Sequence, residues 1–321
     1  MHIPDGFIDG KTAAATAVLS AVGVGLALRR VKHELPPRKV PLLGLAAAFL
    51  FAAQMLNFPV AAGTSGHLIG GVLVAALLGP SAAVVVVTTV LIVQCFLFAD
   101  GGVSALGANI FNMAIVAVMA GYAVYRLLCR WLPGSRGRVT AIAFAGWFST
   151  VLASISCAGQ LALSGTVGWS AAFAAMAGVH VFIGIGEGLI SALVLLSIQR
   201  TRPDLIVNGG RTNGAVGWGA FVGYGLLVAL GLAVFVAPFA CSSPDGLEFV
   251  AETLGFGQKA AHPVLSAPVT DYQMPGVGWN AGATALAGAA GALIVFGLAL
   301  LLGWLLVPKQ TATAPQNTDH T

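Results

Sequence analysis

The chain has 321 residues, of which 58% are hydrophobic and only 8% are charged, and its formal net charge is +4. Soluble domains carry about 25% charged residues, so this composition excludes a soluble globular protein and indicates a chain that lies in a lipid bilayer. The positive charge does not indicate a nucleic-acid partner, because the basic residues gather between apolar runs, where membrane topology places them.

The chain begins with Met1-His2, which offers three nitrogen atoms in a row: the Met1 amine, the His2 backbone amide and the His2 imidazole. Chelation through these atoms closes one five-membered and one six-membered ring and leaves one place in a plane for a fourth ligand. Planar nitrogen coordination is typical of Ni(II) and Cu(II). For this pair taken alone, the more frequent alternative is a second residue without a special role.

The residues from His2 to Gly10 are too polar for a membrane helix and include Pro4 and Gly6. They predict a short non-helical lead-in, which is tolerated at membrane depth only where protein covers it. A secretory signal peptide begins with a basic segment. Because the first basic side chain here is Lys11, we expect no signal peptide and a native N-terminus.

Apolar runs of about 20 residues are expected to cross the bilayer, and somewhat shorter runs do so where neighbouring helices shelter them. With the N-terminus outside, all basic residues except Lys11 and Lys259 fall in inner loops or the inner tail, as the positive-inside rule requires. We therefore predict a multi-pass protein of the cell membrane with the N-terminus outside and the C-terminus in the cytoplasm. The nine predicted spans are residues 12–28, 41–56, 67–78, 82–98, 106–128, 139–163, 171–198, 218–238 and 281–307.

Composition divides the chain into two units. Residues 1–205 contain seven predicted spans with short loops, and residues 206–216 form a linker rich in Gly, Asn and Arg. Residues 217–308 form a two-span hairpin with a long outer loop, residues 240–280. The tail, residues 309–321, is rich in Thr, Ala, Pro and Gln, and we expect it to be disordered in the cytoplasm.

His67 begins the third predicted span at the outer level, where the N-terminus must also lie. It is therefore a reachable fourth ligand for the nitrogens of Met1 and His2. Gly63 and Gly66 favour this interpretation, because glycines let a backbone segment approach closely. The alternative, which is more frequent for an isolated membrane histidine, is a packed or proton-handling group.

Asn109 and Asn112 open the fifth predicted span three residues apart, so they share one helical face near the outer side. Both are candidates for hydrogen bonds to the buried N-terminal loop, and Ser65 is a third candidate for orienting the metal ligands. Ordinary amide bonds between helices are an equal alternative for the two asparagines. Asp100, in a Gly-rich turn, is expected to be solvated.

His180 and Glu187 lie seven residues apart in the seventh predicted span. A zinc hydrolase of the HExxH type needs two histidines four residues apart with an adjacent glutamate, and this sequence has no such pattern. We expect Glu187 to stabilise the bundle or a partner contact. The sequence leaves the roles of His180 and of His262 open. It also contains no Walker A pattern, so ATP-driven transport requires a separate ATPase chain.

Three stretches resemble a known family: Met1 to Phe7, Thr64 to His67 and Leu106 to Phe111. They are similar to the CbiM/NikM family, the substrate-binding membrane components of energy-coupling-factor (ECF) transporters for cobalt and nickel. This resemblance covers residues 1–205. In addition, Ser243 to Glu248 contains Pro-Asp-Gly-Leu-Glu, which resembles the signature of the small CbiN/NikN-type companion component, so the chain looks like a fusion of the two.

The resemblance implies an all-helical bundle of seven spans with the N-terminal loop inserted into its centre, followed by a two-helix hairpin domain. It implies a metal held by the Met1 amine, the His2 amide and imidazole, and the His67 imidazole. That metal is the transported substrate, Ni²⁺ or Co²⁺, and no permanently bound cofactor is implied. The implied partners, besides membrane lipid, are a transmembrane coupling protein and two ATPase subunits, so this chain itself is not an enzyme.

Other functions remain as alternatives. A membrane metalloenzyme needs an open coordination site, whereas four nitrogens in a plane leave no vacancy for an activated water. A metal-sensing receptor without transport would need a cytoplasmic effector beyond the short tail. A secondary transporter typically carries acidic residues in mid-span, and only Glu187 is one. The metal also stays open: planar nitrogen ligation favours Ni(II), Co(II) suits the family equally, and raw affinity favours Cu(II).

Overall fold

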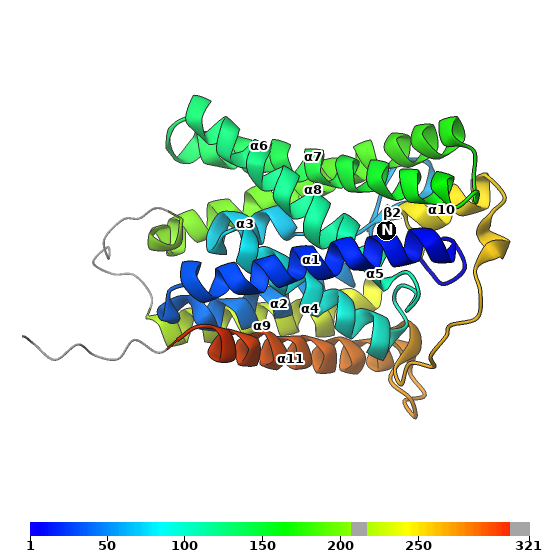
Figure 1. Cartoon of the computed structure of the whole chain (residues 1–321). Helices are drawn as coiled ribbons and strands as arrows, with labels where there is room; N and C mark the ends of the chain where they lie inside the picture. Colours follow the sequence, from blue (N-terminus) through cyan, green and yellow to red (C-terminus); the bar gives the residue numbers. More distant parts are fainter. Residues whose placement is uncertain (207–216, 309–321) are drawn as a thin grey trace, which may run out of the picture.

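The computed structural model describes residues 1–206 and 217–308, and within these ranges the chain is a bundle of long helices (Figure 1). The prediction of an all-helical membrane protein is confirmed. The only sheet among the described residues is a two-stranded antiparallel ladder of β1 (Phe58–Pro59) and β2 (Ser65–Gly66). The predictions of a linker and of a disordered tail fall on 207–216 and 309–321, which lie outside the described residues.

Helices α1 to α8 belong to the first predicted unit, and α9 to α11 belong to the second. Helix α5 continues through a π-helical turn, Ile110–Val116, into α6, and α9 continues through a π-helical turn, Leu232–Val236, and a short 3-10 turn, Ala237–Phe239. The α-helices are α1 (Gly10–Glu34), α2 (Val40–Gln54), α3 (Gly71–Leu78), α4 (Pro80–Phe98), α5 (Leu106–Asn109), α6 (Ala117–Trp131), α7 (Gly134–Leu163), α8 (Trp169–Thr201), α9 (Trp218–Gly231), α10 (Gly246–Thr253) and α11 (Asn280–Leu306).

Seven helices in the described part of the chain are long and apolar enough to cross a membrane. They begin at Gly10, Pro80, Leu106, Gly134, Trp169, Trp218 and Asn280. The other two predicted spans form shorter helices, because α2 has 15 residues and α3 has only eight. Eight residues of α-helix rise about 12 Å, so α3 cannot cross a bilayer by itself.

The segment before α3 is extended, and it supplies the missing length. His67 lies beside the N-terminus, whereas the Leu77 carbonyl accepts a hydrogen bond from Lys39 Nζ at 3.1 Å, at the opposite end of the bundle. Extended backbone inside a bundle needs partners for its polar groups. The Glu187 carboxylate supplies them, because it accepts the backbone N–H groups of Ile69 and Gly70 at 2.6 and 2.8 Å. Glu187 therefore does stabilise the bundle.

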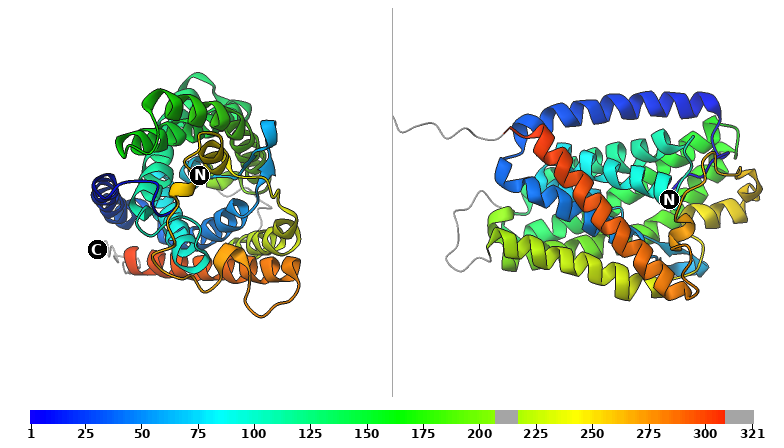
Figure 2. Two further views of the ribbon diagram at one scale, coloured as in Figure 1. Left: turned by 90° about the vertical axis from the view of Figure 1, so that its right-hand side faces the viewer. Right: turned by 90° about the horizontal axis from the view of Figure 1, so that it is seen from below.

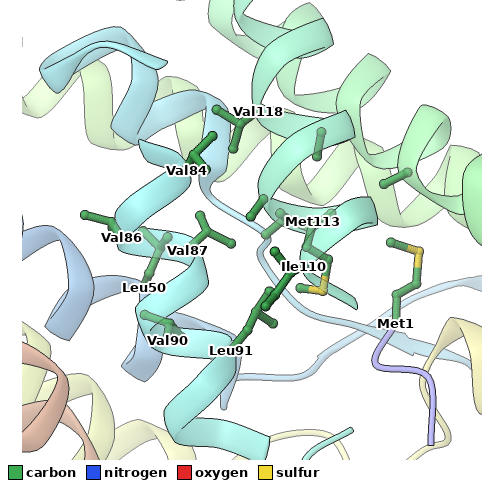
Figure 3. Close-up of a cluster of buried hydrophobic side chains, with 14 of the residues drawn as sticks. Met1, Leu50, Val84, Val86, Val87, Val90, Leu91, Ile110, Met113 and Val118 are labelled. Atoms are coloured by element: carbon green, nitrogen blue, oxygen red, sulfur yellow. The ribbon is translucent and has the colours of Figure 1, made fainter. Parts of the chain in front are cut away.

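Helix α4 forms the middle of the apolar core. Its valines are buried, and they pack beside Leu50, Ile110, Met113 and Val118 from three neighbouring segments (Figure 3). The Met1 side chain belongs to the same buried cluster. Helix α1 lies at the periphery, as the end-on view shows (Figure 2, left, dark blue), and its exposed face is apolar, as expected for a surface in contact with lipid.

The two units pack against each other through α2 and α11, with α9 beside them (Figure 1). The approach of α2 and α11 is close enough to require glycine. A Cβ atom on Gly44 of α2 would lie 2.8 Å from the Phe296 carbonyl oxygen, and one on Gly291 of α11 would lie 2.1 Å from Phe51. Small residues of this kind are what permits membrane helices to pack closely.

Candidate metal centre

The first nine residues form a non-helical segment that protein covers, as the sequence predicts. Seen from one end of the bundle, the N-terminus lies near the middle of the ring of helices (Figure 2, left). The side chains of Met1, Ile3 and Phe7 are buried. Full burial of such side chains stabilises each by about 1.5–3 kcal/mol, so these residues anchor the segment in the bundle.

Asn109 holds this segment through two hydrogen bonds to Ile3. Its Oδ1 accepts the Ile3 N–H at 2.8 Å, and its Nδ2 donates to the Ile3 carbonyl at 3.1 Å. Asn109 thus bonds both backbone groups of one buried residue, and these bonds fix the position of the N-terminal segment along the axis of the bundle.

Asp5 holds the same segment from two sides. Its Oδ1 accepts the Ser104 N–H and hydroxyl at 2.8 and 2.5 Å, from the loop before α5. Its Oδ2 accepts the Val264 N–H at 3.2 Å, and its carbonyl accepts the Ala261 N–H at 2.8 Å, both from the long loop of the second unit. The N-terminal segment therefore lies between the two units and is bonded to each.

The Met1 amine sits at the meeting point of two side chains. It lies 2.7 Å from His67 Nε2 and 2.6 Å from Asp245 Oδ2. Both contacts are shielded, since the side chains of Met1 and Asp245 are 4% and 14% exposed. Burial would raise the pKa of the Asp245 carboxyl, but the Met1 ammonium and the His67 ring outweigh burial and hold that pKa well below its usual range.

The His2 imidazole stacks on that of His67, with ring centroids 5.2 Å apart and the planes inclined by 22°. Its Nδ1 faces Asp100 Oδ1 at 3.1 Å, while its Nε2 is buried and has no hydrogen-bond partner among the described residues. Burial lowers the pKa of His2, although the Asp100 carboxylate opposes this shift. A lowered pKa keeps the imidazole neutral, which is the form that binds metals.

The expectation for Asp100 is wrong, because this side chain is a bonded part of the site and not a solvated turn residue. It contacts His2, and it accepts a hydrogen bond from the Tyr272 hydroxyl at 2.6 Å. The turn directs it inward: Ala99 adopts the left-handed conformation at the end of α4, with φ of 57°. The sequence shows an acidic residue in a turn but not the direction of its carboxylate.

Ser65 and Asn112 do not contact the N-terminal segment. The Ser65 hydroxyl donates to the Ser243 carbonyl at 2.7 Å, and its N–H donates to the Pro244 carbonyl at 2.8 Å. The side-chain bonds of Asn112 go to Gln160 and Ser156 of α7. Asn112 therefore makes the amide bonds between helices that were the equal alternative for it, and it lies in the π-helical turn that starts at residue 110.

The two remaining histidines of the sequence analysis differ in position. His180 is buried on α8, and its Nδ1 lies 2.8 Å from the Met176 carbonyl. Its ring lines a cavity of about 10 Å³ together with Met1 and His67, a volume at the lower limit for one water molecule. His262 is exposed in the long loop of the second unit.

The distance between the Met1 amine and His67 Nε2 suits two neighbouring ligands of one metal ion. With metal–nitrogen bonds of about 2.0 Å, adjacent corners of a square plane are about 2.8 Å apart, and the observed separation is 2.7 Å. Completing the chelate through His2 Nδ1 requires that ring to turn away from Asp100. No group of three or more His, Cys, Asp or Glu side chains in the described ranges is arranged as a metal site.

Comparison with known proteins places this chain in a family. Residues 2–205 match the family described as the cobalt uptake substrate-specific transmembrane region, CbiM, and residues 219–308 match the PDGLE domain. The chain belongs to the CbiM family. It is a CbiM chain fused to a PDGLE domain, as the sequence motifs predict.

This CbiM chain is 36% identical to a putative fused nickel transport protein, NikMN, of Archaeoglobus fulgidus, over 94% of this chain and 98% of that protein. It is 36% identical to the cobalt transport protein CbiM of Streptomyces coelicolor, over 64% of this chain and 91% of the relative. Its fold is similar to the crystal structure of a truncated transition metal transporter, with a TM-score of 0.57 and 34% identity over 62% of this chain and 99% of the other. Its relatives are thus nickel and cobalt transport proteins.

Proposed function

We propose that this chain captures Ni²⁺ or Co²⁺ at the outer face of the cell membrane and passes it inward as the substrate-binding component of an ECF-type transporter. In this proposal residues 1–205 form the metal-binding domain and residues 217–308 form the companion domain. The metal is bound by the Met1 amine, the amide and imidazole of His2, and the imidazole of His67. The metal is cargo, and the chain performs no reaction on it.

The observation that carries this proposal is the contact between the Met1 amine and His67 Nε2. These two nitrogens come from positions 66 residues apart, and they lie 2.7 Å from each other inside the bundle. The His2 ring stacks on the His67 ring, so the imidazole that would supply a further nitrogen lies beside them. Bonds of Asn109 and Asp5 hold the segment that carries the amine.

The nature of the ligands favours nickel and is compatible with cobalt. A plane of four nitrogens is preferred by Ni(II), and the relatives that the chain matches include both nickel and cobalt transport proteins. Because the amine and the amide must lose protons to bind, metal affinity falls as the pH is lowered.

Orientation and partners complete the proposal. The N-terminal site then lies outside, since the opposite end of the bundle carries Lys39 and the arginines at the ends of α6 and α8 and at the start of α7. A coupling protein in the membrane and two ATPase subunits supply the energy, and ATP hydrolysis takes place in those subunits. The C-terminus then lies in the cytoplasm.

The proposal is tested by blocking the amine. We expect a protein with a short Gly-Ser extension before Met1 to bind Ni²⁺ at least about 100-fold more weakly than the same protein after a protease has removed the extension without a scar, because the amine has become an amide. A C-terminal extension of equal length is the control. Equal nickel affinity with and without the N-terminal extension, measured by competition with a chelator, would contradict the proposed ligand set.

A further inference from the structure

The second unit reaches the N-terminus through the five residues Pro244 to Glu248. The Pro244 carbonyl accepts the Ser65 N–H at 2.8 Å, two residues before His67. Leu247 is part of the buried core, and Glu248 Oε2 accepts the Asp245 N–H at 2.9 Å. These contacts fix the start of α10 against the loop that carries His67.

Asp245 divides its two carboxylate oxygens between two tasks. Oδ1 caps helix α10 by accepting the N–H groups of Leu247 and Glu248 at 2.7 and 2.9 Å. Oδ2 accepts the Met1 amine at 2.6 Å. The two bonds of Oδ1 to α10 fix the orientation of the carboxylate. Oδ2 is therefore held in the direction of the Met1 amine.

Gly246 permits the start of α10, and with it the Asp245 carboxylate, to lie close to α8. A Cβ atom on Gly246 would lie 2.7 Å from Ile183 Cδ1 and 2.8 Å from His180 Cε1, so a larger residue here would have to displace these side chains of α8. The start of α10 is thereby pressed onto α8 next to the metal ligands. The position of Asp245 follows from this packing.

A metal complex in this site needs a counter-charge. One divalent ion bound by an amine, two imidazoles and one deprotonated amide has a net charge of +1. An uncompensated charge in a shielded site is strongly destabilising. The Asp245 carboxylate, already in contact with the amine, is placed to neutralise that charge.

We propose that Asp245 is a positioning residue for the metal site, contributed by the second unit. A metal-bound amine keeps two N–H groups, and one of them still donates to Asp245 Oδ2. That bond directs the nitrogen lone pair toward the metal, while the carboxylate neutralises the complex. The inference rests on the proposed function, since it concerns the same metal.

The test is Asp245→Asn, with Ni²⁺ as the probe and the full chain with an authentic N-terminus. Asparagine caps a helix as well as aspartate does, so α10 is expected to stay in place. The substitution removes the charge, and we expect the Kd for Ni²⁺ to rise about 10- to 100-fold, as for other residues that orient a metal ligand. Because the substitution also removes the ion pair with the Met1 amine, the thermal unfolding temperature of the metal-free protein is expected to fall, and the Kd is measured at a temperature at which both proteins are folded.

Glu252→Gln is the matched control, because Glu252 is an exposed acid on the same short helix. It is expected to leave the Kd within about twofold of the wild-type value. If Asp245→Asn does not fold, Asp245→Ser replaces it, since serine also caps helices and has no charge.

The outcomes separate this inference from the proposed function. A folded, uncharged variant at position 245 that binds Ni²⁺ as tightly as the wild type overturns the role of Asp245, while the blocked-amine test still supports the function. Wild-type protein that does not bind Ni²⁺ or Co²⁺ overturns both. A weaker Kd in Asp245→Asn but not in Glu252→Gln supports the positioning role.

Discussion

At the scale of single residues, the Met1 α-amine is the group at which the two units of the chain meet. His67 approaches it from the first unit, and Asp245 approaches it from the second. His2 stands beside it, held by Asp100. In the proposed metal complex, the imidazole shares a metal ion with the amine, and the carboxylate neutralises the charge that the metal ion adds.

His67 and His262 form a matched pair for testing the fourth ligand. We expect His67→Ala to weaken Ni²⁺ binding by about 100-fold or more, because it removes one of the four proposed nitrogen ligands of the metal ion. His262→Ala removes an exposed imidazole and is expected to change the affinity by less than about twofold. Nickel affinity is measured by calorimetry on detergent-solubilised protein. Wild-type affinity in a folded His67→Ala protein would contradict the assignment.

The residues of the site differ in how far the sequence could predict them. Ligand chemistry and a common level in the predicted topology made Met1, His2 and His67 the candidates, and the structure brings these three residues together. Asn109 was a candidate from its place on a helical face, and it is bonded to Ile3. Asp100 and Asp245 were not assigned to the site, because the contact of each depends on backbone direction at a turn or a helix start. Only the packing of α10 onto α8 brings Asp245 to the amine.

At the scale of elements, the unusual feature is the extended segment before α3. A continuous helix would satisfy its own backbone groups, whereas here two N–H groups are bonded by the Glu187 carboxylate of α8. This arrangement places His67 at the start of the segment and leaves room for the N-terminal residues next to it. The sequence indicated a short span over residues 67–78, but not that its first four residues, 67–70, are non-helical.

Glu187→Gln tests this arrangement. Glutamine has one acceptor oxygen in place of two, so one of the backbone N–H groups of Ile69 and Gly70 loses its partner. We expect the free energy of unfolding to fall by about 1–3 kcal/mol, seen as a lower unfolding temperature in detergent by circular dichroism.

Ser191→Ala is the control for Glu187→Gln. Ser191 lies one turn further along α8, buried, and its hydroxyl has no hydrogen-bond partner among the described residues. Its removal is expected to change the unfolding temperature little. An unfolding temperature of Glu187→Gln equal to that of Ser191→Ala would contradict a stabilising role for the carboxylate.

At the scale of the whole molecule, the second unit packs along the bundle and also covers the end of the bundle at which the N-terminus lies. Helix α11 packs along α2, and the loop around α10 bonds to the N-terminal segment at Met1 and Asp5. Hydropathy and charge predicted the two units and the all-helical fold. They could not predict how the units pack, because that depends on where glycines permit backbone contact between helices.

The central claim is that a metal ion binds to nitrogens of Met1, His2 and His67. It is tested most directly by nickel-edge X-ray absorption on the metal-loaded protein with an authentic N-terminus. We predict four nitrogen ligands at about 2.0 Å in a plane, with the scattering pattern of two imidazoles. A six-coordinate ion with mostly oxygen ligands, or a shell with fewer than two imidazoles, would contradict the claim.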